Sequence, residues 1–173
     1  MAREGHAEGR NAVNKKPSYP NVPLKGVGGW LLLLIFVLAI YTPVMGFRSL
    51  YYDFIVSASV FPVLETNPMW VRYRMAVWIV FGILCLFCFG AGYALWKIHK
   101  PISVQFAIGV IWLAGPFVPI IYAAIAAAIF PIAFSQAIKP FYLGIAATAI
   151  QSAIWTGYLV KSVRVKNTYY PGN

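Results

Sequence analysis

The amino-acid sequence predicts an all-α, polytopic membrane protein with four transmembrane helices. Of its 173 residues, 61% are hydrophobic and only 10% are charged. A soluble domain has about a quarter of its residues charged, so this composition is unsuited to a surface that faces water. Four long stretches of the chain contain no charged residue at all. These observations predict a chain that crosses a lipid bilayer several times.

Each of the four stretches has the length that a crossing requires. A helix rises about 1.5 Å per residue, so about 20 apolar residues reach across the roughly 30 Å of bilayer hydrocarbon. Aromatic residues that favour the membrane interface, such as Trp30, Trp96 and Tyr142, lie near their ends. The predicted spans are residues 27–46, 75–96, 106–130 and 142–160.

The segment between the first two spans, residues 47–74, is too long for a turn and too apolar for a solvated linker. Leu50, Tyr51 and Phe54 recur at three- and four-residue steps, while serines and an aspartate lie on the other side. This spacing is typical of an amphipathic helix. We therefore expect a short helix at about residues 49–60 that lies in the membrane interface.

The third span contains two prolines three residues apart, Pro116 and Pro119. Each lacks the amide hydrogen of a helix hydrogen bond, which frees the carbonyl groups of Trp112 and Gly115. We expect the third helix to be kinked at these prolines. Transporters use broken helices to build sites in mid-membrane, but such sites usually include charged groups, and no predicted span contains one. A structural kink is the preferred interpretation, and a binding site is the alternative.

The fourth span carries a stripe of small and hydroxylated residues. Gly144, Thr148, Ser152 and Thr156 repeat every four residues, and Gln151 lies beside them. Small side chains let helix backbones approach closely, and hydroxyl and amide groups hydrogen-bond between helices in a membrane. This pattern predicts a helix-packing or partner-contact face. The spacing leaves open whether the other helix belongs to this chain or to another protein.

Basic residues outside the spans predict the orientation of the chain. Ten lie on the side of the two termini and the link between the second and third spans, against four on the other side. Cytoplasmic loops are enriched in lysine and arginine, so this bias places both termini in the cytoplasm. The predicted organisation is a polar cytoplasmic tail at residues 1–25, a four-helix membrane domain at 26–162 and a basic cytoplasmic tail at 163–173. The first tail is too polar to fold alone, so we expect it to be disordered by itself and to become ordered only against another polypeptide.

The formal net charge of +10 would suggest nucleic acid binding in a soluble protein. Here the basic residues flank apolar spans, where they meet anionic lipid head groups, so nucleic acid is not an expected partner. Cys85 and Cys88 lie within an apolar span, and neither His6 nor His99 has further ligands at metal-binding spacing. We therefore expect no catalytic residue, no metal and no cofactor.

The two ends of the membrane domain carry recognisable motifs. One is LKGVGGWLLL at residues 24–33, which contains Gly28, Gly29 and Trp30; the other is IWTGYLVKSVRVKNTY at residues 154–169. In the second motif the matching residues are Trp155, Tyr158, Ser162, Arg164, Val165 and Thr168. These motifs resemble those of a bacterial inner-membrane family catalogued as domain of unknown function 2569. The resemblance implies a small four-helix protein of the bacterial inner membrane, and it implies no activity because the family has none assigned.

The two motifs are expected to meet in the cytoplasmic head-group layer. Glycines at the start of the first helix permit close approach, while basic residues extend the fourth helix beyond the membrane. Because arginine suits bidentate contacts to phosphate or carboxylate, we expect this region to contact a cytoplasmic partner or lipid head groups. Orientation by positive charge alone is an equal alternative. The candidate contact residues are Gly28, Gly29, Trp30, Lys161, Ser162, Arg164 and Lys166.

The leading hypothesis is a non-enzymatic accessory or structural subunit of a larger membrane complex, with membrane lipids and other integral membrane subunits as partners. It would dock through the polar stripe of the fourth span and through its basic cytoplasmic ends. The alternative is a small transporter or lipid-binding protein that uses the kinked third helix.

Overall fold

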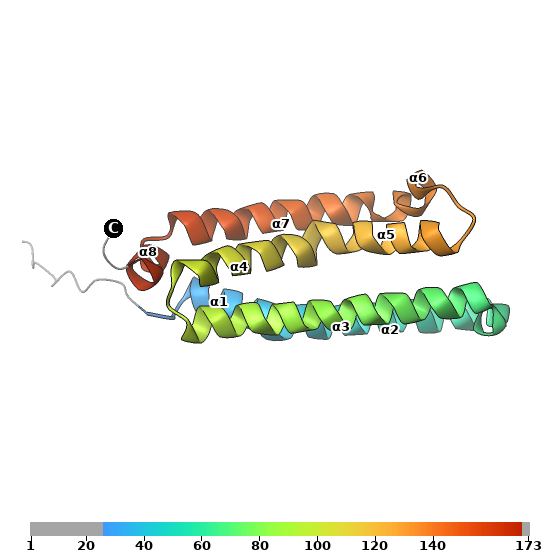
Figure 1. Cartoon of the computed structure of the whole chain (residues 1–173), viewed down its shortest axis with the longest axis horizontal. Helices are drawn as coiled ribbons and strands as arrows, with labels where there is room; N and C mark the ends of the chain where they lie inside the picture. Colours follow the sequence, from blue (N-terminus) through green and yellow to red (C-terminus); the bar gives the residue numbers. More distant parts are fainter. Residues whose placement is uncertain (1–25, 171–173) are drawn as a thin grey trace, which may run out of the picture.

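A computed structural model describes residues 26–170 of the chain, and within this range it contains helices and no strand. Figure 1 shows long helices that run side by side, with helices α1 and α8 at one end of the bundle. Four helical stretches are long and apolar enough to cross a membrane. We call them the first to fourth spans; they are Trp30–Val60, Pro68–Lys97, Pro101–Ile129 and Phe134–Lys161. The predicted all-α fold with four membrane-spanning helices is confirmed, and the chain is a multi-pass membrane protein.

The first span is longer than predicted and contains a wide turn. It consists of α1 (Trp30–Phe36), the π-helical turn η1 (Val37–Tyr41) and α2 (Thr42–Val60), which follow one another without a break. Pro43 stands at the start of α2 and cannot donate a hydrogen bond to the preceding turn, which favours an irregular turn there. At about 1.5 Å per residue, the span reaches about 46 Å.

The second and third spans both start at a proline. The second is the single helix α3 (Pro68–Lys97), and the third comprises α4 (Pro101–Trp112), the π-helical turn η3 (Leu113–Phe117) and α5 (Val118–Ile129). Proline suits the first turn of a helix because the amides there have no intrahelical acceptor. Inside the third span, Pro116 lies within η3, so the helix is irregular where the sequence predicts a kink.

Residues 49–60, expected to form a separate interfacial helix, instead continue α2. No proline or glycine interrupts them, and their apolar residues keep helical spacing. They pack on α3, where the ring of Phe54 lies 5.7 Å from that of Trp70 and 6.4 Å from that of Tyr73. The connection between the first two spans is therefore only the 3-10 turn η2 (Pro62–Thr66) with its flanking residues.

The fourth span begins with two short turns before its long helix. These are α6 (Phe134–Ala137) and η4 (Lys139–Phe141), and the long helix is α7 (Tyr142–Lys161). The chain then bends at Ser162, whose backbone is extended with φ −65° and ψ 124°, and forms α8 (Val163–Tyr169). The fourth helix therefore does not extend through the basic residues as expected, and most of the predicted tail is a folded helix.

Helix α8 folds back because one of its faces is apolar. Val165 and Tyr169 are fully buried, and Thr168 is 5% exposed. Residues four apart share a helix face, so Val165 and Tyr169 pack together against the end of the bundle. Figure 1 shows α8 lying across that end, beside the start of α1. The predicted polar tail at residues 1–25, with its expected partner contact, lies outside the described residues.

The four spans pack mainly in the order of the sequence. The first contacts the second, the second contacts the third, and the third contacts the fourth, whereas the first and fourth make few contacts with each other. Large apolar side chains point outward from the bundle; Leu86 is 72% exposed and Leu143 is 84% exposed. Such a surface is suited to lipid and unsuited to water. The packing order leaves one side of the bundle open.

Candidate functional site

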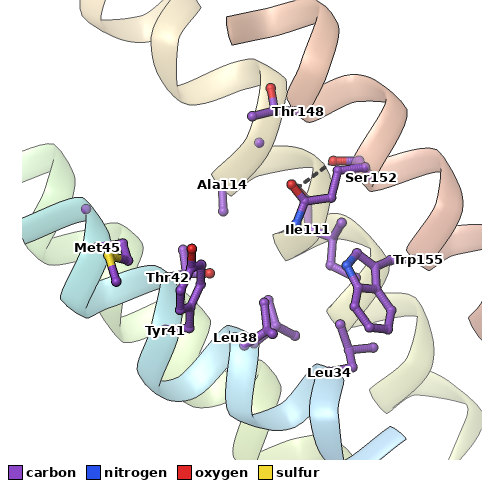
Figure 2. Close-up of a pocket in the computed structure, with 14 residues that line it drawn as sticks. Leu34, Leu38, Tyr41, Thr42, Met45, Ile111, Ala114, Thr148, Ser152 and Trp155 are labelled. Atoms are coloured by element: carbon purple, nitrogen blue, oxygen red, sulfur yellow. Dashed lines mark hydrogen bonds between the residues drawn. The ribbon is translucent and has the colours of Figure 1, made fainter. Parts of the chain in front are cut away.

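A lateral cleft of about 270 Å³ opens between the first and fourth spans, with the third span as its floor. Figure 2 shows Leu38, Tyr41 and Thr42 on the wall formed by the first span, and Ser152 and Trp155 on the wall formed by the fourth. The cleft exists because these two spans make few contacts with each other. Its lining is mainly aliphatic, but hydroxyl and amide groups also line it.

Both π-helical turns border the lateral cleft. Tyr41 belongs to η1 and Ala114 belongs to η3, and both residues line the space. Each turn is next to or contains a proline, Pro43 in one case and Pro116 in the other. Turns of this kind are rare and are frequent at functional sites. The irregular parts of two spans therefore meet at the same cleft.

The stripe predicted on the fourth span packs against the third span of the same chain. Ser152 is 2% exposed, and its hydroxyl donates a hydrogen bond to the carbonyl oxygen of Ile111 at 3.2 Å (Figure 2). A Cβ atom at Gly115 would lie only 2.7 Å from that hydroxyl, so the two helices approach closely here. One turn further on, Thr156 accepts a hydrogen bond from the indole of Trp112 at 3.2 Å. These polar groups are bonded inside the molecule.

The other residues of the stripe are placed differently. The Thr148 hydroxyl donates a hydrogen bond to the carbonyl of Gly144 at 2.8 Å, and a Cβ atom at Gly144 would meet no neighbouring atom within 4 Å. Gln151 is exposed at the middle of α7 and lines the lateral cleft. Within residues 26–170, its side-chain amide has no hydrogen-bond partner. The side-chain amide of Gln151 is therefore exposed near the middle of the fourth span and without a hydrogen-bond partner in residues 26–170.

The two sequence motifs meet at one end of the bundle in an arrangement that we call the terminal clamp, made of Gly26, Gly28, Gly29, Arg164 and Thr168. The amide of Gly26 donates a hydrogen bond to the hydroxyl oxygen of Thr168 at 2.9 Å, and that hydroxyl donates to the carbonyl oxygen of Arg164 at 2.7 Å. A Cβ atom at Gly28 would lie 2.7 Å from Nη1 of Arg164, so the guanidinium group lies against bare backbone. Gly29 has a φ of 57°, which other residues rarely adopt.

Aromatic residues surround the terminal clamp. Trp30 lies edge-on to Trp155, with ring centroids 6.5 Å apart. Tyr169 donates a hydrogen bond to the carbonyl oxygen of Leu95, which belongs to the last turn of α3, where carbonyls lack intrahelical partners. Burial, with a smaller effect of the Tyr158 phenol, raises the pKa of Tyr169 to about 12. Helix α8 thus caps α3 as well as contacting the start of the first span.

Residues 24–170 match the family described as "Protein of unknown function (DUF2569)", which is most of the chain. The chain belongs to the DUF2569 family. No curated protein and no solved structure matches it. In this DUF2569 chain, residues that carry the resemblance, including Gly28, Gly29 and Arg164, lie together in the terminal clamp. The two motifs therefore share a structural role, which is to join the ends of the membrane domain.

The clamp end of this DUF2569 protein is basic. Within residues 26–170 the carboxylates are Asp53 in α2 and Glu65 in η2, and both lie toward the opposite end of the bundle (Figure 1). The Arg164 guanidinium therefore has no carboxylate partner in the described part of the chain. The basic residues at the clamp end are Lys97, Lys100, Lys161, Arg164 and Lys166. Anions that pair with them come from lipid, from another chain or from residues of this chain outside 26–170.

Some predicted site residues lie outside the terminal clamp, and one residue that packs beside the clamp was not predicted. Lys161 and Lys166 are exposed beside it, and Ser162 forms the bend before α8. Sequence reasoning missed Tyr169, although its spacing of four residues from Val165 was a signal for an apolar helix face. In the described range, no group of three or more His, Cys, Asp or Glu side chains could hold a metal ion.

Proposed function

We propose that this DUF2569 protein is a non-catalytic accessory subunit of the bacterial inner membrane, which binds the transmembrane helix of a partner protein in its lateral cleft. The observation that carries the proposal is Gln151, whose exposed amide has no hydrogen-bond partner within residues 26–170. Hydrocarbon chains neither donate nor accept hydrogen bonds, so an uncovered amide at mid-membrane is costly. A polar side chain or a close backbone on a partner helix would satisfy it.

The lining of the lateral cleft supports the same function. Ala114 and Thr148 line it with small side chains, which allow the backbone of another helix to approach. Ser152 and Thr156 of the polar stripe are bonded to the third span, so partner docking is assigned to the part of the stripe that faces the cleft at Gln151. The polar side chains that line the cleft carry hydroxyls, the Gln151 amide and the Trp155 indole, which suit helix recognition better than acid–base chemistry.

The proposed orientation puts the clamp end in the cytoplasm. Five of the nine basic residues within 26–170 lie at that end, where the described range has no carboxylate. The other four lie toward the opposite end, together with Asp53 and Glu65. An excess of lysine and arginine is typical of the cytoplasmic side of inner-membrane proteins.

Co-purification from mild detergent tests the proposed function. Gln151→Leu replaces the amide with an aliphatic side chain of similar size. We expect the amount of co-purified partner protein, identified by mass spectrometry, to fall strongly. Ile150→Leu is the matched control, because Ile150 is 64% exposed on the same helix and does not line the cleft. Equal recovery of partners with both variants, or no partner with the wild-type protein, would refute the proposal.

A second candidate function is the binding or transport of a small neutral solute in the same cleft. The observation that favours it is the position of η1 and η3 on the cleft, because π-helical turns often mark functional sites. This function predicts a protein that purifies without stoichiometric partner chains and carries a bound small molecule.

A further inference from the structure

A second hollow, which we call the α8 groove, lies where α4, α7 and α8 meet at the clamp end. Its volume is about 670 Å³, larger than that of the lateral cleft. It shares no lining residue with the cleft, so a ligand of the groove is distinct from the proposed partner helix. The residues that line it include Val104, Gln105, Ile108, Leu159, Lys166 and Tyr170.

The apolar and polar parts of the α8 groove lie at different depths. Ile108 is three residues further into α4 than Gln105, which is about 4.5 Å along the helix axis. Leu159 lies before the end of α7, whereas Lys166 lies beyond it in α8. The polar lining residues therefore lie near the end of the bundle, where Val104 also lies, and the deepest lining residue of α4, Ile108, is aliphatic. A phospholipid has the same division along its length.

The terminal clamp holds α8 so that Lys166 lies at the groove. Arg164 and Thr168 contact the start of the first span from one face of α8. Lys166 and Tyr170 are also four residues apart, and both line the groove from another face. Lys166 is exposed, and the described residues provide no carboxylate at this end of the bundle.

We propose that the α8 groove binds one acidic phospholipid, with its phosphate at Lys166 and an acyl chain along Ile108 and Val160. The lysine is complementary to the charge of the phosphate, and the aliphatic wall is complementary to the acyl chain. An acidic peptide would match the lysine but would not match an apolar wall at membrane depth.

Native mass spectrometry of the full chain in detergent, with phosphatidylglycerol or phosphatidylcholine added, tests this proposal. We expect the wild-type protein to retain one phosphatidylglycerol in preference to phosphatidylcholine. Lys166→Gln should lower the affinity for phosphatidylglycerol about fivefold, the effect of one cation near an anionic lipid, and leave phosphatidylcholine binding unchanged. Lys100→Gln is the matched control, because Lys100 is exposed at the same end but does not line the groove, and we expect no change.

A second variant tests the apolar part of the groove. Val160 lines the groove and is 56% exposed, so Val160→Trp should fill the groove without disturbing the core and should abolish lipid retention. Free glycerol phosphate should not displace the bound lipid, since it lacks the acyl chain. The proposal is wrong if phosphatidylglycerol is not preferred, if Lys166→Gln and Lys100→Gln behave alike, or if glycerol phosphate displaces the lipid.

Discussion

The guanidinium group of Arg164 occupies the space that a side chain at residue 28 would need. A Cβ atom at Gly28 would lie 2.7 Å from Nη1 of Arg164, closer than unbonded atoms approach. The contact joins the start of the first span to α8, which follows the fourth span. The two ends of the membrane domain are thereby fixed to each other.

Gly28→Ala should lower the thermal stability of the protein only slightly, because the added methyl group displaces the guanidinium at the end of the flexible Arg164 side chain. In an Arg164→Ala background the same change should have almost no further effect, since the obstructing group is gone. Thermal unfolding in detergent of the two single variants and the double variant measures this coupling. If the stability losses of Gly28→Ala and Arg164→Ala simply add in the double variant, the contact with Arg164 is not what requires a glycine at residue 28.

Gly29→Ala provides the contrasting case. The φ of 57° at Gly29 strains any residue with a side chain, at a cost of about 1 to 3 kcal/mol. We expect this loss in both the wild-type and the Arg164→Ala backgrounds, because backbone strain does not depend on the guanidinium. A loss that disappears with Arg164→Ala would show that crowding and not strain is the cause.

Tyr169→Phe should destabilise the protein by about 1 to 3 kcal/mol, because the buried carbonyl of Leu95 loses its hydrogen-bond donor. The raised pKa of about 12 adds a pH signature. The stabilisation that comes from the neutral Tyr169 phenol in the folded protein is fully present below pH 10, the ordinary pKa of tyrosine. It is lost as the pH rises through about 12. We expect this additional loss of stability in the wild-type protein but not in Tyr169→Phe. Parallel pH profiles for the two proteins would contradict the assignment.

Ser152→Leu should destabilise the bundle by about 1 to 3 kcal/mol. The larger side chain has no space beside Gly115, and the hydrogen bond to Ile111 is lost. Ala153→Leu is the control, because Ala153 is exposed on the neighbouring position of the same helix. Thermal unfolding in detergent compares the two variants. An equal and small effect of both would mean that Ser152 does not lie at a close helix contact.

The spans could be predicted because they depend on a local property of the chain. Twenty apolar residues without a charge have few alternatives to a membrane helix, and each predicted span overlaps one observed helix, with residues 27–29 and 130 falling outside. The stripe at Ser152 and Thr156 was also visible, since its period of four residues is a property of one helix. What the sequence left open was which helix it contacts.

The rest depends on contacts between residues far apart in the sequence. Nothing in the local pattern shows that the hydroxyl of Thr168 bonds the amide of Gly26, or that α8 turns back at Ser162. The prediction of a separate interfacial helix at residues 49–60 was wrong. The same amphipathic spacing is expected of an interfacial helix and of a helix that packs on α3. The lateral cleft was invisible because it results from the absence of contacts between two spans.

The orientation of the bundle can be measured with fusions after Asn173. Ten basic residues on the side of the termini against four on the other predict a cytoplasmic carboxyl end. A fluorescent protein fused there should fluoresce, and alkaline phosphatase fused there should be inactive. An active phosphatase would reverse the proposed orientation.

Site-specific photo-crosslinking in intact membranes tests the partner-helix proposal most directly. A photoreactive amino acid at Gln151 faces the lateral cleft, whereas one at Leu143, which is 84% exposed and outside the cleft, serves as the control. The proposal predicts a discrete crosslinked protein band with the probe at Gln151 and none with the probe at Leu143. Crosslinking to lipid alone at Gln151, or the same products from both positions, would contradict it.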